Sequence, residues 1–220
     1  MPQDQQHWEV VYGAKAPDQV SWFRPHLETS LALIERATQG NRSASIVEVG
    51  GGACTLVDDL IERRYGNLTI ADISQTALDV ARDRLGRAAA DRVHWLRGDV
   101  TQPGFLTRSF DVWHDRAVFH FLATPEERLA YVRNASLAVN PGGHVIVSTF
   151  GPEGPAKCSG LPVARYDAGS LHGEFGSRLA GDDLLFQHAH SGQLSKGDGQ
   201  QRGLACHFLA EQSIAGKHRV

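Results

Sequence analysis

The stretch SIVEVGGGACTL, residues 45–56, gives the strongest indication of the fold. Its first five residues form a short β-rich run, which predicts a buried strand. Three glycines follow, and the next segment, CTLVDDLIERRYG (54–66), places Leu56, Leu60 and Ile61 at helical spacing. A strand that passes through a glycine-rich turn into a helix is typical of the crossover units of a parallel sheet.

Predicted strands and helices continue to alternate along the chain. Ser74 predicts a helix start and Gly86 a helix stop, and Thr124 followed by Pro125 predicts a second helix start. Two further segments with helical spacing precede the first strand, and two strands near the C-terminus lack a helix between them, which favours an antiparallel hairpin at the sheet edge. The further predicted strands are 67–74, 92–100, 109–115, 144–150, 183–190 and 203–212, and the further predicted helices are 4–13, 25–39, 74–86 and 124–143. We therefore expect an α/β, Rossmann-like, doubly wound fold.

Composition narrows the class of protein. Charged residues make up 21% of the chain and the formal net charge is −3, so nothing favours binding to nucleic acid or to an anionic membrane. The N-terminal sequence lacks the pattern of a signal peptide, and no window has about 20 apolar residues. The three cysteines are far apart, as is typical of a reducing compartment, which predicts a cytoplasmic protein.

The glycines and two aspartates point to a ligand. In a doubly wound sheet the ligand lies at the carboxyl ends of the strands, and Gly50 and Gly52 fall on the first such turn. A tight turn without a ligand is the alternative. Asp72 ends the second predicted strand, where a carboxylate can accept hydrogen bonds from both ribose hydroxyls, and Asp99 ends the third, where it can reach an adenine amine. Together they favour an adenosine pocket.

The residues around the glycines discriminate between adenosine ligands. A dinucleotide site requires a small residue where this chain has Thr55. Glu48 would repel a pyrophosphate, whereas it suits the ammonium and sulfonium charges of S-adenosylmethionine. No phosphate-binding G-x-x-x-x-G-K-[ST] motif is present.

Five segments resemble the motifs of class I S-adenosylmethionine-dependent methyltransferases. The likeness covers about residues 44–150, and the hairpin at 183–212 suits that family's sheet. The segments are VEVGGGACTL, TIADIS, GDV, FDVWHDRAVFHFL and NPGGHVIVS.

The resemblance implies one domain, 1–220, around a seven-stranded, mostly parallel sheet with an antiparallel C-terminal edge hairpin. Within it, residues 1–43 would form a helical lid, 44–150 the cofactor-binding core, and 151–220 a substrate-side loop and the edge hairpin.

The resemblance also implies roles for residues at the strand ends. Asp72 would hold the ribose, with Ile73 against the adenine, and Asp99 and Val100 would meet the adenine edge and face. The methionine part would lie near the remaining cofactor residues, which are Glu48, Gly50, Gly51, Gly52 and His114.

The segment after the fourth strand offers candidates for the acceptor site. Its His114–Ala117 sequence differs from the Asn-Pro-Pro-aromatic motif of DNA amino-methyltransferases. Asp115 is a candidate to bind or deprotonate a substrate, or it orders the loop together with Arg116. His120 is a candidate base, or a half-buried structural histidine.

Aromatic residues gather before the first strand. Tyr12 and Trp22 are candidates to face the sulfonium through cation–π attraction, whereas Trp8 is expected to pack the helices onto the sheet. Cys158 either contacts a soft substrate or is structural. We expect no metal site, because the histidines 188, 190 and 207 are better explained as incidental residues of the edge hairpin.

The sequence thus predicts methyl transfer from S-adenosylmethionine to a small-molecule nucleophile. A protein-lysine acceptor is the alternative within the family. A nicotinamide-dependent reductase, which Thr55 and Glu48 oppose, and a non-catalytic adenosine-binding module are alternatives from other classes. Nothing in the sequence indicates the oligomeric state.

Overall fold

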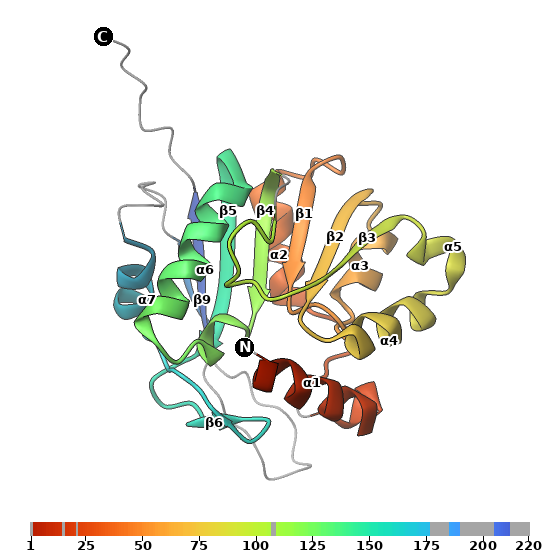
Figure 1. Ribbon diagram of the computed structural model, residues 1–220. Helices are drawn as coiled ribbons and strands as arrows, with labels where there is room; N and C mark the ends of the chain where they lie inside the picture. The colour runs from red at the N-terminus through yellow and green to blue at the C-terminus, as the bar shows by residue number, and fades with distance from the viewer. Residues whose placement is uncertain are drawn as a thin grey trace, which may run out of the picture.

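The computed structural model describes residues 2–14, 16–20, 22–106, 109–176, 185–189 and 205–211. Five parallel strands form the body of the sheet in the order β3-β2-β1-β4-β5, and an antiparallel pair, β9 and β8, continues it beyond β5 (Figure 1). The strands are β1 (Ser45–Val49), β2 (Asn67–Asp72), β3 (Val93–Arg97), β4 (Phe110–Arg116), β5 (Val139–Phe150), β8 (Leu185–Ala189) and β9 (Ala205–Glu211). The predicted α/β fold, with a mostly parallel sheet and an antiparallel hairpin, is therefore confirmed.

Helices cover both faces of the sheet. The strand order reverses between β1 and β4, so the chain returns to the centre and winds outward a second time. Beyond the α-helices there are two short 3₁₀ turns, η1 (Pro17–Gln19) and η2 (Phe119–Phe121), and a small hairpin of β6 (Lys157–Cys158) and β7 (Leu161–Pro162). The helices are α1 (Pro2–Ala14), α2 (Glu28–Thr38), α3 (Leu56–Glu62), α4 (Gln75–Leu85), α5 (Arg87–Ala90), α6 (Pro125–Ala138) and α7 (Ala168–Phe175).

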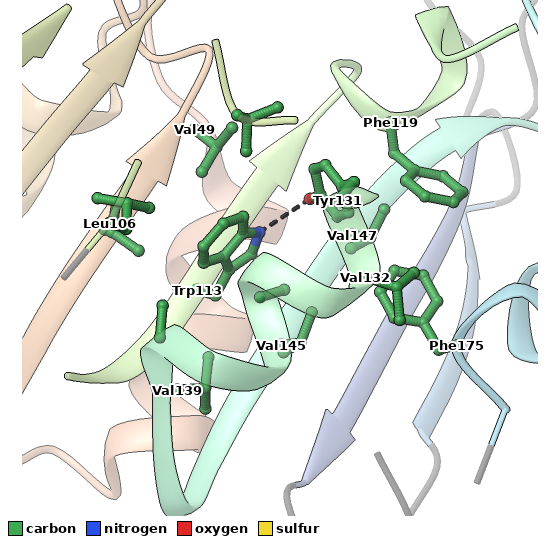
Figure 2. Close-up of a cluster of buried hydrophobic side chains, with 14 of the residues drawn as sticks. Val49, Leu106, Trp113, Phe119, Tyr131, Val132, Val139, Val145, Val147 and Phe175 are labelled. Atoms are coloured by element: carbon green, nitrogen blue, oxygen red, sulfur yellow. Dashed lines mark hydrogen bonds between the residues drawn. The ribbon is translucent and has the colours of Figure 1, made fainter. Parts of the chain in front are cut away.

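Successive side chains of a strand point to opposite faces of the sheet, so the buried side chains form two hydrophobic cores, one on each face. Val47 and Val49 of β1 pack with α6 and α7, whereas Ile46 packs with α2, α3 and α4 on the opposite face. The first core centres on Trp113 of β4, whose indole Nε1 donates a 2.8 Å hydrogen bond to the hydroxyl of Tyr131 in α6 (Figure 2). The direction in which a β4 side chain points therefore decides which layer it enters.

The predicted helix boundaries follow from local hydrogen bonds. The Ser74 hydroxyl accepts from the Ala77 amide at the start of α4, and Gly86 ends that helix with φ 71°. Thr124 and Glu127 form a capping box at the start of α6. The prediction missed α5, α7 and the β6–β7 hairpin, and it began β5 at residue 144, whereas Val139 already pairs with Phe110 before a shift in register.

Helix α1 is fixed to the start of α4 by one carboxylate. Glu9 accepts hydrogen bonds from the amides of Gln75 (2.8 Å) and Thr76 (3.0 Å) and from the hydroxyl of Ser74 (3.0 Å). Burial acts to raise the pKa of Glu9, but these hydrogen bonds hold it below its usual value. An acidic group at a helix N-terminus is also favoured by the helix dipole. This contact places α1 next to the carboxyl ends of the strands.

Within the described residues, no helix has the length and apolar character needed to cross a membrane. The side chains of histidines 188, 190 and 207 lie outside the described part of the chain.

Candidate functional site

A cavity of about 430 Å³ lies at the carboxyl ends of the strands, beside the point where the strand order reverses. This is a usual volume for a small-molecule site and the usual place for one in an open α/β sheet. Four parts of the chain contribute to its lining: the N-terminal segment, the ends of β1 to β3, the loop after β4, and the end of β5 with the β6–β7 hairpin. Lining residues include Trp8, Tyr12, Trp22, Glu48, Gly50, Asp72, Ile73, Asp99, Val100, Arg116, Phe121 and Cys158.

Close contacts require glycine at all three positions of the turn after β1. Gly50 has φ 69°, and a Cβ there would collide with the side chain of Val118 in the loop after β4. A Cβ at Gly52 would lie 2.7 Å from the carboxylate of Asp72, and one at Gly51 would lie 2.7 Å from that of Glu48. Gly50 lines the cavity, whereas Gly51 and Gly52 lie behind it and allow the two carboxylates to approach the turn.

Glu48 is a buried acid at the cavity wall. It is 2% exposed, and its Oε2 atom has no hydrogen-bond partner among the described residues. Burial raises the pKa of Glu48 to about 8, and a hydrogen bond with Cys54 and the charge of Arg116 oppose that increase. A carboxyl group with a free acceptor atom is suited to a cationic ligand group.

Asp72 joins the glycine turn to the start of α4. Its Oδ2 atom accepts from the Gly52 amide at 3.0 Å, and its Oδ1 atom accepts from the Ser74 amide at 2.8 Å. Burial raises the pKa of Asp72 to about 6, although these backbone hydrogen bonds act in the other direction. Each oxygen retains a second lone pair, so the carboxylate can accept further hydrogen bonds from a ligand.

The end of β3 supplies the next part of the wall. Asp99 accepts hydrogen bonds from the amide and the hydroxyl of Thr101, at 2.8 and 2.7 Å, which fixes its carboxylate in a turn. Asn134 of α6 donates to the carbonyl of Val100 at 2.6 Å and holds the same segment from behind. Asp99, Val100 and Ile73 all line the cavity.

His114 lies elsewhere than expected. It is fully buried in β4, next to Glu48 in strand register, and it is absent from the cavity lining. Two residues further along the same strand face, Arg116 reaches the cavity instead. The end of β4 therefore contributes a cation where the sequence suggested a histidine.

Asp115 points away from the cavity, into the layer beneath α6. Its Oδ1 atom accepts from the Val118 amide (2.8 Å), and its Oδ2 atom accepts from the Phe119 amide (3.0 Å) and the Tyr131 hydroxyl (2.6 Å). The side chain is fully buried, and burial raises its pKa to about 6. Of the two roles open for Asp115, the geometry favours the structural one, because Asp115 lies on the same strand face as Trp113 and both bond to Tyr131 of α6.

His120 also lies behind the cavity wall. The ring packs against Phe121 and Phe150, with centroids 4.4 and 4.9 Å away, and within the part of the chain that the structure describes neither ring nitrogen has a hydrogen-bond partner. Burial lowers the pKa of His120 to about 4, so the ring is neutral at pH 7. The geometry favours the structural alternative over a catalytic base for this residue.

Aromatic rings form one wall of the cavity. The Trp8 ring lies 5.9 Å from Tyr12 (stacked), 6.0 Å from Trp22 and 5.1 Å from Phe121, measured between centroids. Tyr12 and Trp22 line the cavity, and so does Trp8, which was expected to pack the helices onto the sheet. No sequence pattern indicates Phe121 as a lining residue, because none shows that the loop after β4 turns back towards α1.

Cys158 also lines the cavity, from the β6–β7 hairpin. It is partly buried, and burial raises the pKa of its thiol while the charge of Arg116 opposes this.

Comparisons with known proteins agree with this geometry. The family model described as "Methyltransferase domain" matches residues 47–145, which run from within β1 to within β5. No curated protein matches the sequence.

Solved structures share the fold. One, from a study of the conversion of a disulfide bond into a thioacetal group during echinomycin biosynthesis, has a TM-score of 0.71 at 16% identity, covering 96% of this chain and 94% of the other. The glycopeptide N-methyltransferase MtfA, complexed with S-adenosylmethionine, has a TM-score of 0.60 at 16% identity over 82% and 92% of the two chains. A TehB-like S-adenosylmethionine-dependent methyltransferase from Corynebacterium glutamicum has a TM-score of 0.60 at 12% identity over 97% and 100%.

The residues of the cavity fit the cofactor of this family. The free Oε2 atom of Glu48 suits an ammonium group, Asp72 and Asp99 lie at consecutive strand ends, and the glycine turn admits a ligand against its backbone. Residues 47–145 thus match a methyltransferase domain, the fold is that of the S-adenosylmethionine-dependent methyltransferases compared above, and the cavity residues fit S-adenosylmethionine.

Proposed function

We propose that the protein transfers the methyl group of S-adenosylmethionine to a nucleophilic atom of a small molecule. The aromatic wall is the observation that carries this proposal. Trp8, Tyr12, Trp22 and Phe121 come from three separate segments and line the same cavity as the cofactor residues. A pocket of this kind suits a compact apolar or aromatic molecule. The β5 edge, where an extended peptide could add as a strand, is occupied by β9.

The proposal assigns the cofactor to the ends of β1, β2 and β3. Glu48 would accept from the ammonium group beside Gly50, and Asp72 would accept from the ribose hydroxyls. Ile73 and Val100 would pack on the adenine, with Asp99 at its amine. The bound cofactor supplies an electrophilic methyl group on a sulfonium, and the chain aligns an acceptor with it and excludes water.

The N-terminal segment acts as the lid in this proposal. Glu9 fixes α1 to α4, and this places Trp8 and Tyr12 over the cavity, where their rings can also face the sulfonium. The proposal includes the family's seven-stranded form of the sheet, with β8 and β9 as its antiparallel edge. Asp115 and His120 act as positioning residues behind the wall.

Competing methyl acceptors test the proposal. Radiolabelled S-adenosylmethionine is incubated with the protein and either a panel of small amines, phenols, thiols and carboxylic acids, or lysine-rich unfolded polypeptides. We expect label in the small-molecule fraction. Label in the polypeptides instead would contradict the small-molecule proposal. Label in neither, with S-adenosylhomocysteine still bound, would favour a binding module without turnover.

The pKa of Glu48 leads to a prediction about proton release. With a pKa of about 8, Glu48 is about nine-tenths protonated at pH 7 in the free protein. An ammonium group beside it favours the ionised form, so binding of S-adenosylhomocysteine at pH 7 should release close to one proton, and the release should vanish above about pH 9. Calorimetry in phosphate and in Tris buffer measures the number of protons.

Two controls make this assignment specific. Glu48→Gln cannot ionise and should bind S-adenosylhomocysteine without releasing a proton. The ligand 5′-methylthioadenosine lacks the ammonium group and should release none from the unchanged protein. Equal proton release by both ligands would assign the proton to another group.

A further inference from the structure

Arg116 is a cation placed in an otherwise mostly apolar part of the cavity. It is partly buried at the end of β4, and its two terminal nitrogens both donate to the carbonyl oxygen of Trp22 at 3.3 Å. The ion pairs found within the described residues do not include it, whereas Arg42, Arg63, Arg84 and Arg128 each pair with a carboxylate. The other cavity arginine, Arg24, is exposed.

The guanidinium lines the same cavity as Glu48 and Cys158 and acts electrostatically on both. Its charge acts to lower the pKa of Glu48, at the end assigned to the methionine part of the cofactor. It acts in the same direction on the pKa of Cys158, in the β6–β7 hairpin. Glu48 and Arg116 also share one face of the sheet, because Glu48 is in register with His114 and Arg116 lies two residues further along β4.

The contacts of Arg116 leave most of its binding capacity unused. A guanidinium has five donors in a planar fork that matches a carboxylate with two parallel hydrogen bonds. Two long bonds to one carbonyl do not supply that partner, and burial in an aromatic cavity makes a charge without a counter-ion costly. The residue therefore needs an anionic partner that the described chain does not supply.

We propose that Arg116 binds a carboxylate at the point where cofactor and acceptor meet. This inference rests on the proposed function, since it concerns the same cavity. The carboxylate belongs either to the methionine part of the cofactor, with Glu48 taking the ammonium, or to an acidic acceptor molecule. Both sources use the same bidentate contact, and binding experiments separate them.

The first experiment compares two ligands by calorimetry. S-adenosylhomocysteine carries the amino-acid carboxylate and 5′-methylthioadenosine does not. If the cofactor is the source, Arg116→Met should weaken S-adenosylhomocysteine binding roughly 10- to 100-fold, with 5′-methylthioadenosine changed less than about twofold. Arg116→Lys, which keeps the charge but not the planar fork, should fall between. Arg87→Met, at an exposed arginine of α5 outside the cavity lining, is the control and should change neither affinity.

The second experiment tests the acceptor as the source. Phenylacetate and its neutral analogue phenylacetamide are titrated into the complex with S-adenosylhomocysteine. If the acceptor supplies the carboxylate, phenylacetate should bind the unchanged protein more tightly than the amide, and Arg116→Met should remove the difference. S-adenosylhomocysteine affinity should then be insensitive to the substitution.

Two results would overturn the inference. An equal loss of both adenosine ligands would mean that Arg116 acts only by holding Trp22 in the lid. No dependence of any carboxylate probe on Arg116 would leave the residue without an anionic partner. Either result is distinguishable from failure of the proposed function, because S-adenosylhomocysteine binding to the unchanged protein and labelling of a small acceptor are measured separately.

Discussion

Replacing Asp72 by alanine should weaken S-adenosylhomocysteine binding at least about 100-fold. Two hydrogen bonds from ribose hydroxyls to a buried carboxylate would be lost, each worth about 1.5–3 kcal/mol. The substitution also removes the acceptor for the Gly52 and Ser74 amides, which loosens the turn that carries the glycines. Both effects act in the same direction, and calorimetry measures their sum.

Two further variants separate direct contact from loosening. Asp72→Asn keeps the shape of the side chain and one acceptor oxygen, so it should retain part of the affinity. Asp79→Ala removes an exposed carboxylate from the same helix region and should leave binding unchanged. Affinity within about threefold of the unchanged protein for Asp72→Ala, or saturable binding of NADH, would mean that the ribose site is assigned to the wrong residue.

Replacing Asp115 by alanine should lower the free energy of unfolding by about 3 kcal/mol or more. Three donors would lose their acceptor in a fully buried layer: the amides of Val118 and Phe119 and the hydroxyl of Tyr131. Each buried donor left unsatisfied costs about 1–3 kcal/mol. For a chain of 220 residues, 3 kcal/mol corresponds to a decrease in Tm of about 6–12 °C.

Stability and turnover together distinguish a positioning role from a catalytic one. Tyr131→Phe removes one of the three donors and should cost about 1 kcal/mol. Asp115→Asn should lose some stability and keep measurable turnover at temperatures where it is folded. If Asp115→Asn were as stable as the unchanged protein but inactive towards an identified acceptor, Asp115 would be a catalytic base, contrary to its position in the structure.

The part of the site that was predictable lies at the ends of β1, β2 and β3. In a parallel sheet, the last residue of each strand reaches the same edge, so Gly50, Asp72 and Asp99 converge once the strands are recognised. The mostly parallel sheet and its antiparallel hairpin were predictable for a similar reason, since the lengths of the alternating segments allow few other topologies.

The acceptor side was less predictable, because it depends on which way individual side chains point. Asp115 and Arg116 are adjacent, yet alternation along β4 sends the first under α6 and the second into the cavity. A shift of one residue in the strand would exchange them. His120 lies in a 3₁₀ turn that returns against Phe150, and no periodic pattern predicts such a turn. The start of α7, by contrast, carries a capping signal at Asp167 and Ser170 that could have been found.

Different segments of the sequence form different parts of the cavity wall. Under the proposed function, its cofactor half would come from the central segment, residues 48–100, and its acceptor half from residues 8–27 and from loops beyond residue 116. The two halves can therefore diverge at different rates, because a substitution in the N-terminal segment or the β6–β7 hairpin alters the acceptor pocket without moving the glycine turn. Such an arrangement allows one methyl-donor site to acquire new substrates in the course of evolution, and it makes these outer segments the natural places for exchange between relatives in protein engineering.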